Sequence, residues 1–358
     1  MAQNSDTAPR TVLMTRFSAF GDVAMTVPVV YSACRCYPEL RFVMVTRPSM
    51  VSIFVDAPEN LVVTGVDVKE KYKGVGGLYR LARHLCGEYH PDTYIDLHNV
   101  LRTKVLGIFL RLRGLKTSTI YKARSGRRSL TRMHNKVMLP LTSQRARYRE
   151  AFFKAGFPLT EHFDGLFNGP GTAAPELYGA ITAPKPDGEK WVGVAPFAAH
   201  KGKIYPLEMM EKVIAYIDDE GRRRGLRVFL LGGGDHEARV LDAWAAKYPS
   251  ATSLAGKKYG FAAELALFNH LDVMLCMDSA NMHLAAIAGA PTVSIWGATH
   301  PYCGFKAWRQ SEADIVQLPL VCRPCSVFGD RDCPRGDYLC LTGIRPETVF
   351  QHVMDHLL

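Results

Sequence analysis

Short apolar segments alternate with amphipathic segments along most of the chain. The first, Thr11–Thr15, is typical of a buried strand because a brief apolar run ends in a polar, glycine-containing turn. Residues 23–37 follow with helical spacing and stop before Pro38. The same patterns predict strands at 41–46, 61–64, 93–97, 191–195, 226–231, 273–276 and 292–296, and helices at 78–85, 207–220, 236–248, 264–269 and 282–288. Strands that alternate with helices indicate parallel sheets with crossover helices.

A change in composition divides this pattern into two halves. Residues 167–190 are rich in Gly, Pro, Ala and Thr and lack periodicity, which is typical of an interdomain linker. A chain of 358 residues is also long enough for two domains of ordinary size. We expect two doubly wound α/β domains facing a central cleft, with ligands at the carboxyl ends of the strands. The predicted division is 1–170 and 191–345, with a linker at 171–190 and a C-terminal helix at 346–358.

The overall composition is that of a soluble globular protein, with 47% hydrophobic and 22% charged residues. No stretch approaches the ~20 uninterrupted apolar residues that a membrane-spanning helix requires. The polar segment Met1–Arg10 lacks the apolar region of a signal peptide. We therefore expect a cytoplasmic protein, in which disulfide bonds are unusual.

The net charge of +10 is concentrated in one segment. Residues 101–149 contain 14 Lys and Arg and no Asp or Glu, so they carry more than the whole positive surplus. Such a run favours an anionic partner, which could be a phosphorylated substrate, an acidic membrane surface or nucleic acid; a solvated basic face is the alternative. Nucleic acid is disfavoured because the segment contains no recognisable binding module.

The turn after the first predicted strand reads Arg16-Phe-Ser-Ala-Phe-Gly-Asp22. In an open α/β sheet this is a preferred place for chemistry. Gly21 permits a tight backbone, and Asp22 begins the next helix. An aspartate at this position has two interpretations: it caps the helix, or it serves as a general base.

A second motif, Asp278-Ser-Ala-Asn-Met-His283, joins a strand to a helix in the second half. The first amides of a helix are unpaired, and together with the helix dipole they favour a bound phosphate. Asp278 could also act only as a cap, and His283 could be a hydrogen-bonded core residue. The run Gly232–Glu237 lacks the Gly-x-Gly-x-x-Gly spacing of dinucleotide-binding enzymes, which disfavours a dehydrogenase.

Together these motifs resemble those of glycosyltransferase family 9, the heptosyltransferases. Residues 16–28 are similar to the family's opening Arg-x-Ser-x-x-Gly-Asp-[Val/Ile] with Thr-x-Pro behind it, and residues 278–286 to its Asp-[Ser/Thr]-Gly-x-x-His-Leu-Ala-Ala motif. Ala280 stands where the family usually has Gly. The resemblance extends to Glu347 and implies a GT-B fold of two Rossmann-like domains, inverting displacement, and neither a catalytic metal nor a cofactor.

The resemblance also implies roles for individual residues. Asp22 would be the general base, and Lys203, within a motif that has Tyr205 in place of the family's Trp, would offset charge on the departing diphosphate. The implied donor-binding residues are Lys201, Glu237, Asp278, Ser279, Ala280 and His283. The implied acceptor-binding residues are Ser18 in the first turn and, in a segment where His98 replaces the customary Gln, His98, Asn99, Arg102 and Lys104. The basic run Lys122–Arg132 is a further acceptor-side candidate.

Four cysteines lie close together near the C-terminus, at Cys322, Cys325, Cys333 and Cys340. In a cytosolic chain this spacing suggests a structural zinc before disulfides, and reduced, packed thiols are the alternative. We expect no catalytic role for them.

The function that the resemblance implies is transfer of heptose from ADP-heptose to the phosphorylated inner core of lipopolysaccharide. The expected partners are a nucleotide-sugar donor, a phosphorylated glycolipid acceptor and the anionic inner face of the inner membrane, with peripheral attachment. Two alternatives are a GT-B transferase that uses another nucleotide-sugar for cell-surface glycan synthesis, and a non-enzymatic nucleic-acid binder acting through residues 101–149.

Overall fold

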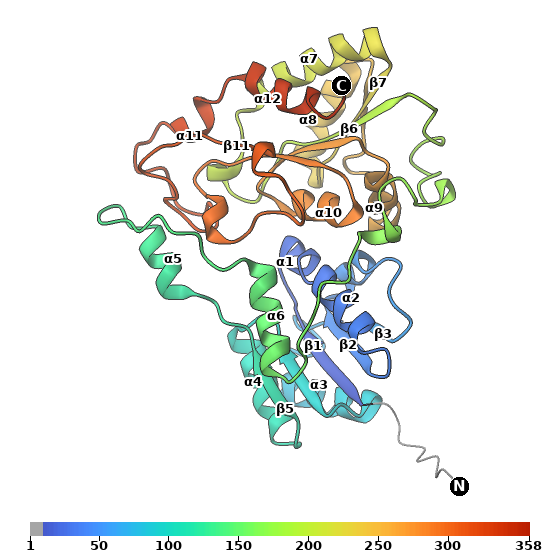
Figure 1. Ribbon diagram of the computed structural model, residues 1–358, viewed down its shortest axis with the longest axis vertical. Coiled ribbons are helices and arrows are strands. Elements are labelled where there is room, and N and C mark those ends of the chain that lie inside the picture. Colours follow the sequence, from blue (N-terminus) through green and yellow to red (C-terminus); the bar gives the residue numbers. More distant parts are fainter. Residues whose placement is uncertain (1–9) are drawn as a thin grey trace. The chain divides into compact units, whose positions relative to one another are not determined.

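The computed structural model describes residues 10–358; residues 1–9, which contain most of the segment judged not to be a signal peptide, lie outside this range. The chain forms two compact units (Figure 1). The first contains the chain up to residue 122 together with 144–163, and the second contains 123–143 together with 164–358. This division differs from the expected one, because 123–143, in the middle of the basic segment, belongs with the second unit.

The first unit is built on a five-stranded parallel sheet in the order β3-β2-β1-β4-β5. Helices α3 and α4 pack together on one side of the sheet, and α2 and α6 pack together on the other (Figure 1). The strands are β1 Thr11–Thr15, β2 Arg41–Thr46, β3 Leu61–Gly65, β4 Thr93–Asp96 and β5 Lys116–Thr119. The helices are α1 Phe20–Ala24, α2 Val27–Cys36, α3 Gly74–Tyr89, α4 Leu101–Arg111 and α6 Gln144–Lys154, with the 3-10 turn η1 Pro48–Ile53.

The helix predicted at 23–37 is in fact two helices. Helix α1 ends at Ala24 and α2 begins at Val27. Pro28 has no backbone N–H and therefore cannot continue the hydrogen-bond ladder from α1, but it is well suited to the first turn of a new helix. The side chain of Thr26 donates to the Val23 carbonyl at 2.6 Å and occupies an acceptor at the break. The prediction of one continuous helix was wrong for this reason.

The second unit has a six-stranded parallel sheet in the order β11-β10-β9-β6-β7-β8. Its strands are β6 Lys190–Ala195, β7 Leu226–Leu230, β8 Ala251–Ser253, β9 Val273–Met277, β10 Thr292–Ile295 and β11 Ile315–Val316. Its helices are α5 Arg124–Leu130, α7 Leu207–Arg224, α8 Gly234–Lys247, α9 Phe261–Asn269, α10 Ala280–Ala288, α11 Leu339–Thr342 and α12 Pro346–Met354. Short 3-10 turns lie at η2 Leu166–Asn168, η3 Pro175–Leu177, η4 Lys201–Lys203, η5 Pro301–Cys303 and η6 Glu312–Asp314.

The segment expected to be a linker is packed onto the second unit. Tyr178 is buried, with its ring 5.9 Å from that of Trp191 and 4.9 Å from that of His270. The amide side chain of Asn269 donates to the Gly169 carbonyl and accepts from the Ala173 N–H. The ring of Tyr178 and the side chain of Asn269 thus hold the segment 167–190 in place, although its sequence lacks periodicity.

The fold class is confirmed: each unit is an α/β domain with a parallel sheet. Within residues 10–358, no helix is both long enough and apolar enough to cross a membrane.

Candidate functional site

The first group of predicted residues lies at the carboxyl edge of the first sheet. Strands β1 and β4 are neighbours, and Thr15 pairs with Asp96 in the parallel register. The segments that follow the two strands, 16–22 and 97–99, therefore leave the sheet side by side. Parallel pairing brings together two motifs that are about 80 residues apart in the sequence.

Asp22 is the third residue of α1, and its carboxylate is held from two directions. Its Oδ2 accepts the N–H of Ala19 at 3.2 Å and lies 2.6 Å from Nη2 of Arg16. Both contacts use Oδ2, so Oδ1 has no protein partner among the described residues, and the side chain is 25% exposed. Asp22 thus serves as a cap, yet it keeps one carboxylate oxygen available for a proton.

Arg16 positions Asp22, although the sequence analysis assigned it no role of its own. Its side chain is buried and also donates from Nη1 to the Leu97 carbonyl at 2.8 Å. Burial opposes the charge, but Tyr148 and Asp22 outweigh it and raise the pKa of Arg16, so the guanidinium stays charged. A buried guanidinium needs a carboxylate partner. Because Arg16 and Asp22 lie in one short motif, the sequence could have predicted this ion pair.

His98 and Ser18 form a second contact between the same two segments. The N–H of Phe17 donates to Nδ1 of His98 at 3.4 Å, and Nε2 lies 3.3 Å from Oγ of Ser18. Burial, reinforced by Arg16 and Lys122, lowers the pKa of His98 to about 3. The neutral ring therefore carries its hydrogen on Nε2 and donates it to Ser18, which leaves the serine hydroxyl hydrogen free to meet a substrate.

His98 should make the protein less stable in acid. Its pKa is about 3 in the fold and 6.5 ordinarily, so between these values the unfolded chain binds a proton that the folded chain does not. The free energy of unfolding then falls as the pH falls, by about 2 kcal/mol from this group between pH 7 and pH 5. In urea titrations, His98→Gln should reduce the pH 7-to-5 loss by about that amount. An equal loss in both proteins would contradict this prediction.

Of the remaining predicted acceptor-binding residues, Asn99 is held by a hydrogen bond, and Arg102 and Lys104 are exposed. Asn99 donates from Nδ2 to the Ile120 carbonyl at 2.7 Å and so joins the loop after β4 to the end of β5. Asp96, which was not selected from the sequence, accepts the N–H groups of His98 and Asn99, each at 2.8 Å. Arg102 and Lys104 are exposed in the first turns of α4. Within residues 10–358, Asp22 forms its ion pair with Arg16 and Ser18 bonds to His98, so neither of the two cations is joined to this group.

The second group of predicted residues lies at the carboxyl edge of the second sheet. Strand β9 lies between β6 and β10, with Cys276 opposite Ala195 and Met277 opposite Ile295. The loops that follow these strands are therefore adjacent. A Cβ on Gly297 would lie 2.5 Å from the Gly202 carbonyl oxygen, so only glycine allows the two loops to approach this closely.

Asp278 is at the centre of this second group. Its Oδ2 lies 2.9 Å from Nζ of Lys203 and accepts the hydroxyl of Thr299 at 2.8 Å. The carboxylate is 5% exposed and the lysine side chain 16%. The structure thus brings together two of the predicted residues, Lys203 and Asp278, and adds Thr299, which the sequence analysis missed.

The first turn of α10 follows directly. Ser279 is its N-cap, but the side chain makes no capping hydrogen bond. Its Oγ is buried and has no partner among the described residues. An N-cap serine normally accepts a helix amide, so here both the hydroxyl and the first amides are available to an anion. Ala280 is the first residue of the helix and is half-buried.

The other predicted donor-binding residues have different surroundings. The Lys201 ammonium lies 4.9 Å from the centre of the Tyr338 ring. Glu237 accepts the Gly233 N–H at 2.7 Å and caps its own helix, α8. His283 is buried within α10.

Arg323 is a further buried cation that sequence reasoning did not find. It donates to the carbonyls of Gly297, Leu318 and Thr299 and to the side chain of Gln317. These bonds fix the turn that carries Thr299. Nothing in the local sequence distinguishes this arginine, because its partners lie on two separate stretches, 297–299 and 317–318.

The four C-terminal cysteines are free thiols, as are all nine in the chain. Cys325 donates to the Ala298 carbonyl, and burial raises the pKa of Cys340 to about 11. Within residues 10–358, no three His, Cys, Asp or Glu side chains are grouped in a way that could hold a metal ion.

Comparison with known proteins agrees with these observations. Residues 78–333 match the model of glycosyltransferase family 9 (heptosyltransferase). Lipooligosaccharide heptosyltransferase 2 of Campylobacter jejuni is 31% identical over 86 residues, which are 24% of this chain and 26% of that protein. The match therefore spans about a quarter of that relative.

Two further relatives match over most of their length. Lipopolysaccharide heptosyltransferase 3 of Escherichia coli is 26% identical over 313 residues, covering 83% of this chain and 85% of that one. The structure of Escherichia coli ADP-heptose lipopolysaccharide heptosyltransferase II superposes with a TM-score of 0.70 at 15% identity, covering 97% and 98% of the two chains. The fold is therefore GT-B, and the chain belongs to glycosyltransferase family 9, the heptosyltransferase family.

Proposed function

We propose that this protein is an inverting glycosyltransferase that moves heptose from ADP-heptose to the phosphorylated inner core of lipopolysaccharide. The observation that carries the proposal is the pair Lys203–Asp278 beside the uncapped first turn of α10. A cation next to free helix amides and an unpartnered serine hydroxyl suits the diphosphate of a nucleotide-sugar.

The first unit supplies the base for the same reaction. As the acceptor hydroxyl attacks the anomeric carbon, Oδ1 of Asp22 would take its proton, and the bond from that carbon to the diphosphate oxygen would break with inversion. ADP leaves with the bonding electron pair. The Lys203 ammonium and the amides of α10 would offset the charge that grows on it, so no metal or cofactor is required in this scheme.

The choice of sugar and acceptor is supported by the relatives and by charge. The relatives matched over most of their length are named as lipopolysaccharide heptosyltransferases, one of them with ADP-heptose in its name. The basic segment 101–149 suits a phosphorylated, membrane-borne acceptor at the cytoplasmic, anionic face of the inner membrane. We propose peripheral attachment there and no nucleic-acid partner.

A donor panel tests the proposal. ADP-heptose, GDP-mannose and UDP-glucose are compared by thermal shift and by turnover with a lipid A–Kdo acceptor. ADP-heptose at 100 times its Kd should stabilise the protein by about 2.7 kcal/mol and support turnover. Stabilisation and turnover with a UDP- or GDP-sugar alone would favour the alternative, a GT-B transferase with another donor.

The structural zinc remains a prediction that metal analysis tests directly. Mass spectrometry of protein purified without chelator, with titration of free thiols, separates the two alternatives. About one zinc per chain with the four thiols Cys322, Cys325, Cys333 and Cys340 protected would support zinc. Full thiol reactivity after unfolding without any metal would support reduced, packed cysteines.

A further inference from the structure

The outer face of α3 and α4 carries a row of exposed apolar side chains. Val75, Tyr79, Leu101, Ile108 and Leu112, which we call the α3–α4 patch, are between 47% and 79% exposed. Leu101, Ile108 and Leu112 follow one stripe of α4, and Val75 and Tyr79 follow one stripe of α3. The two stripes adjoin, because the Tyr79 ring lies 5.5 Å from that of Phe109 in α4.

This exposure is not needed for folding. Helix α4 already buries Thr103, Leu106 and Leu110 in the first unit. Single exposed apolar residues are ordinary, but a contiguous row on two neighbouring helices marks an interaction surface. Helix α4 is therefore apolar on two sides, and only one of them is covered.

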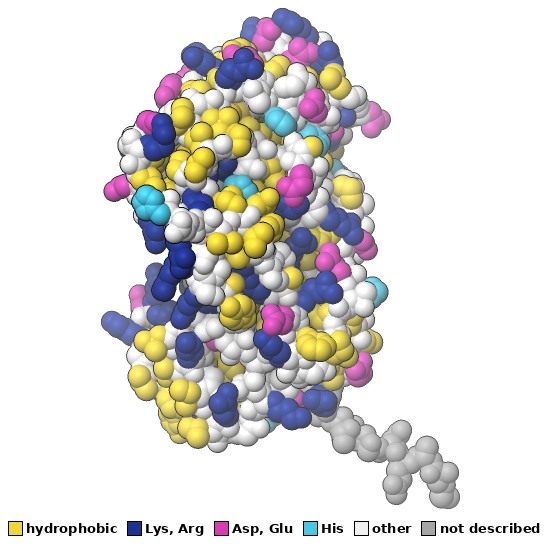
Figure 2. Space-filling view, turned by 60° about the vertical axis from the view of Figure 1, so that its left-hand side comes forward, with side chains coloured by type: hydrophobic (Ala, Val, Ile, Leu, Met, Phe, Trp, Pro, Cys, Tyr) yellow, Lys and Arg dark blue, Asp and Glu magenta, His cyan; other side chains and the backbone are white. Residues whose placement is uncertain are grey.

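Cations border the patch. Arg102, Lys104, Arg111 and Arg113 belong to α4 or follow it directly, and residues 101–149 contain no acid. The Arg113 guanidinium lies 5.7 Å from the centre of the Tyr79 ring. Figure 2 shows hydrophobic side chains gathered at the lower left, in the part formed by the first unit, with Lys and Arg nearby. The apolar row and the positive charge thus share one face.

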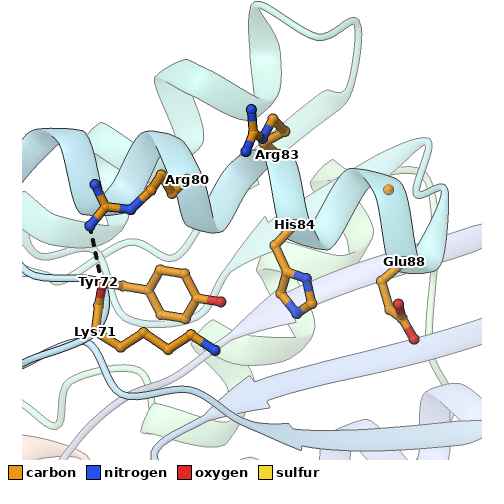
Figure 3. Close-up of a pocket in the computed structure, with 7 residues that line it drawn as sticks. Lys71, Tyr72, Arg80, Arg83, His84 and Glu88 are labelled. Atoms are coloured by element: carbon orange, nitrogen blue, oxygen red, sulfur yellow. Dashed lines mark hydrogen bonds between the residues drawn. The ribbon is translucent and has the colours of Figure 1, made fainter.

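A basic hollow of about 430 Å³ adjoins the patch on α3 (Figure 3). It is lined by Lys71, Tyr72, Arg80, Arg83, His84, Gly87 and Glu88. Arg83 follows Tyr79 by one helical turn, so the hollow continues from the edge of the patch. Figure 3 shows Lys71 extending below the Tyr72 ring toward His84, while Arg80 is fixed by its bond to the Lys71 carbonyl. Such a hollow suits a phosphate group.

We propose that the α3–α4 patch docks on an anionic phospholipid bilayer, with its apolar side chains among the acyl chains and its cations at the lipid phosphates. The hollow would hold one headgroup. A second copy of the chain is a poorer occupant, since a symmetric contact through this face would set the same Arg and Lys residues against each other. This inference rests on the proposed function in one respect: it gives the location of the peripheral membrane attachment that we propose above.

The test uses the full chain and vesicles that contain no sugar acceptor. Flotation at low salt should show binding to phosphatidylcholine vesicles with about 30% phosphatidylglycerol, and weak binding to phosphatidylcholine alone. The triple variant Leu101→Ser, Ile108→Ser, Leu112→Ser should bind on the order of 30-fold more weakly. The control Leu177→Ser, Val321→Ser removes exposed apolar residues of the second unit and should bind like wild type.

A second measurement separates insertion from charge attraction. In the variant Leu112→Trp, brominated lipids should quench the fluorescence of the introduced side chain. Part of the vesicle binding should also survive at 0.5 M salt, because salt does not screen apolar contact. Wild-type binding by the triple variant, or no quenching, would overturn the proposal. A wild-type dimer that is lost in the triple variant would also overturn it, because the patch would then be a dimer interface. Turnover of the triple variant on a detergent-solubilised acceptor should stay within about twofold of wild type, so that failure of the transferase proposal is seen separately.

Discussion

Asp22→Asn is expected to lower kcat by about 10³-fold while the KM for the donor stays within about threefold. The asparagine side chain can still accept the Ala19 N–H, so α1 keeps its cap. It cannot take a proton from a sugar hydroxyl at neutral pH. The ion pair to Arg16 is also lost, which should lower the free energy of unfolding by about 1–2 kcal/mol.

The matched control is Asp235→Asn, the same change at an exposed acid in the first turn of α8. It should leave kcat within about twofold of wild type. Initial rates with saturating donor, together with urea titrations, measure both effects. If Asp22→Asn keeps more than about a tenth of wild-type kcat, Asp22 is a helix cap and another group is the base.

Lys203→Met should lower kcat/KM by about 10²–10³-fold, because it removes the charge that we propose offsets the departing diphosphate. It should also destabilise the second unit by about 2–4 kcal/mol. The Asp278 carboxylate is nearly buried, and without the lysine its remaining side-chain partner is the Thr299 hydroxyl.

The two effects of Lys203→Met can be separated by a second substitution. Lys203→Met with Asp278→Asn removes the unpaired charge and should recover most of the lost stability, but not the activity. Lys201→Met is the control, because that ammonium lies against the Tyr338 ring and it is Lys203 that pairs with Asp278. Its effect on kcat/KM should stay below about threefold. Loss of activity with Lys201→Met instead of Lys203→Met would reverse the assignment.

Most of the secondary structure could be predicted because it is decided locally. A buried parallel strand such as β9 is an apolar run whatever surrounds it, and an amphipathic helix such as α7 shows its buried stripe in its spacing. The turns that carry Asp22 and Asp278 were found for the same reason, since each directly follows such a strand. The division at Thr26 was missed because propensity alone gives little weight to one missing N–H at Pro28.

The sequence by itself determined the alternation of strands and helices, the two-unit α/β architecture, and the two motifs with Asp22 and Asp278. Only the tertiary structure decided which neighbours complete each motif. Arg16 pairs with Asp22, Lys203 rather than Lys201 pairs with Asp278, and residues 123–143 pack with the second unit. The physical reason is that these choices depend on parallel pairing between distant strands, which places loops beside one another regardless of their separation in the chain. Periodicity reports which side of a helix is apolar, but not whether anything covers it, as α4 illustrates.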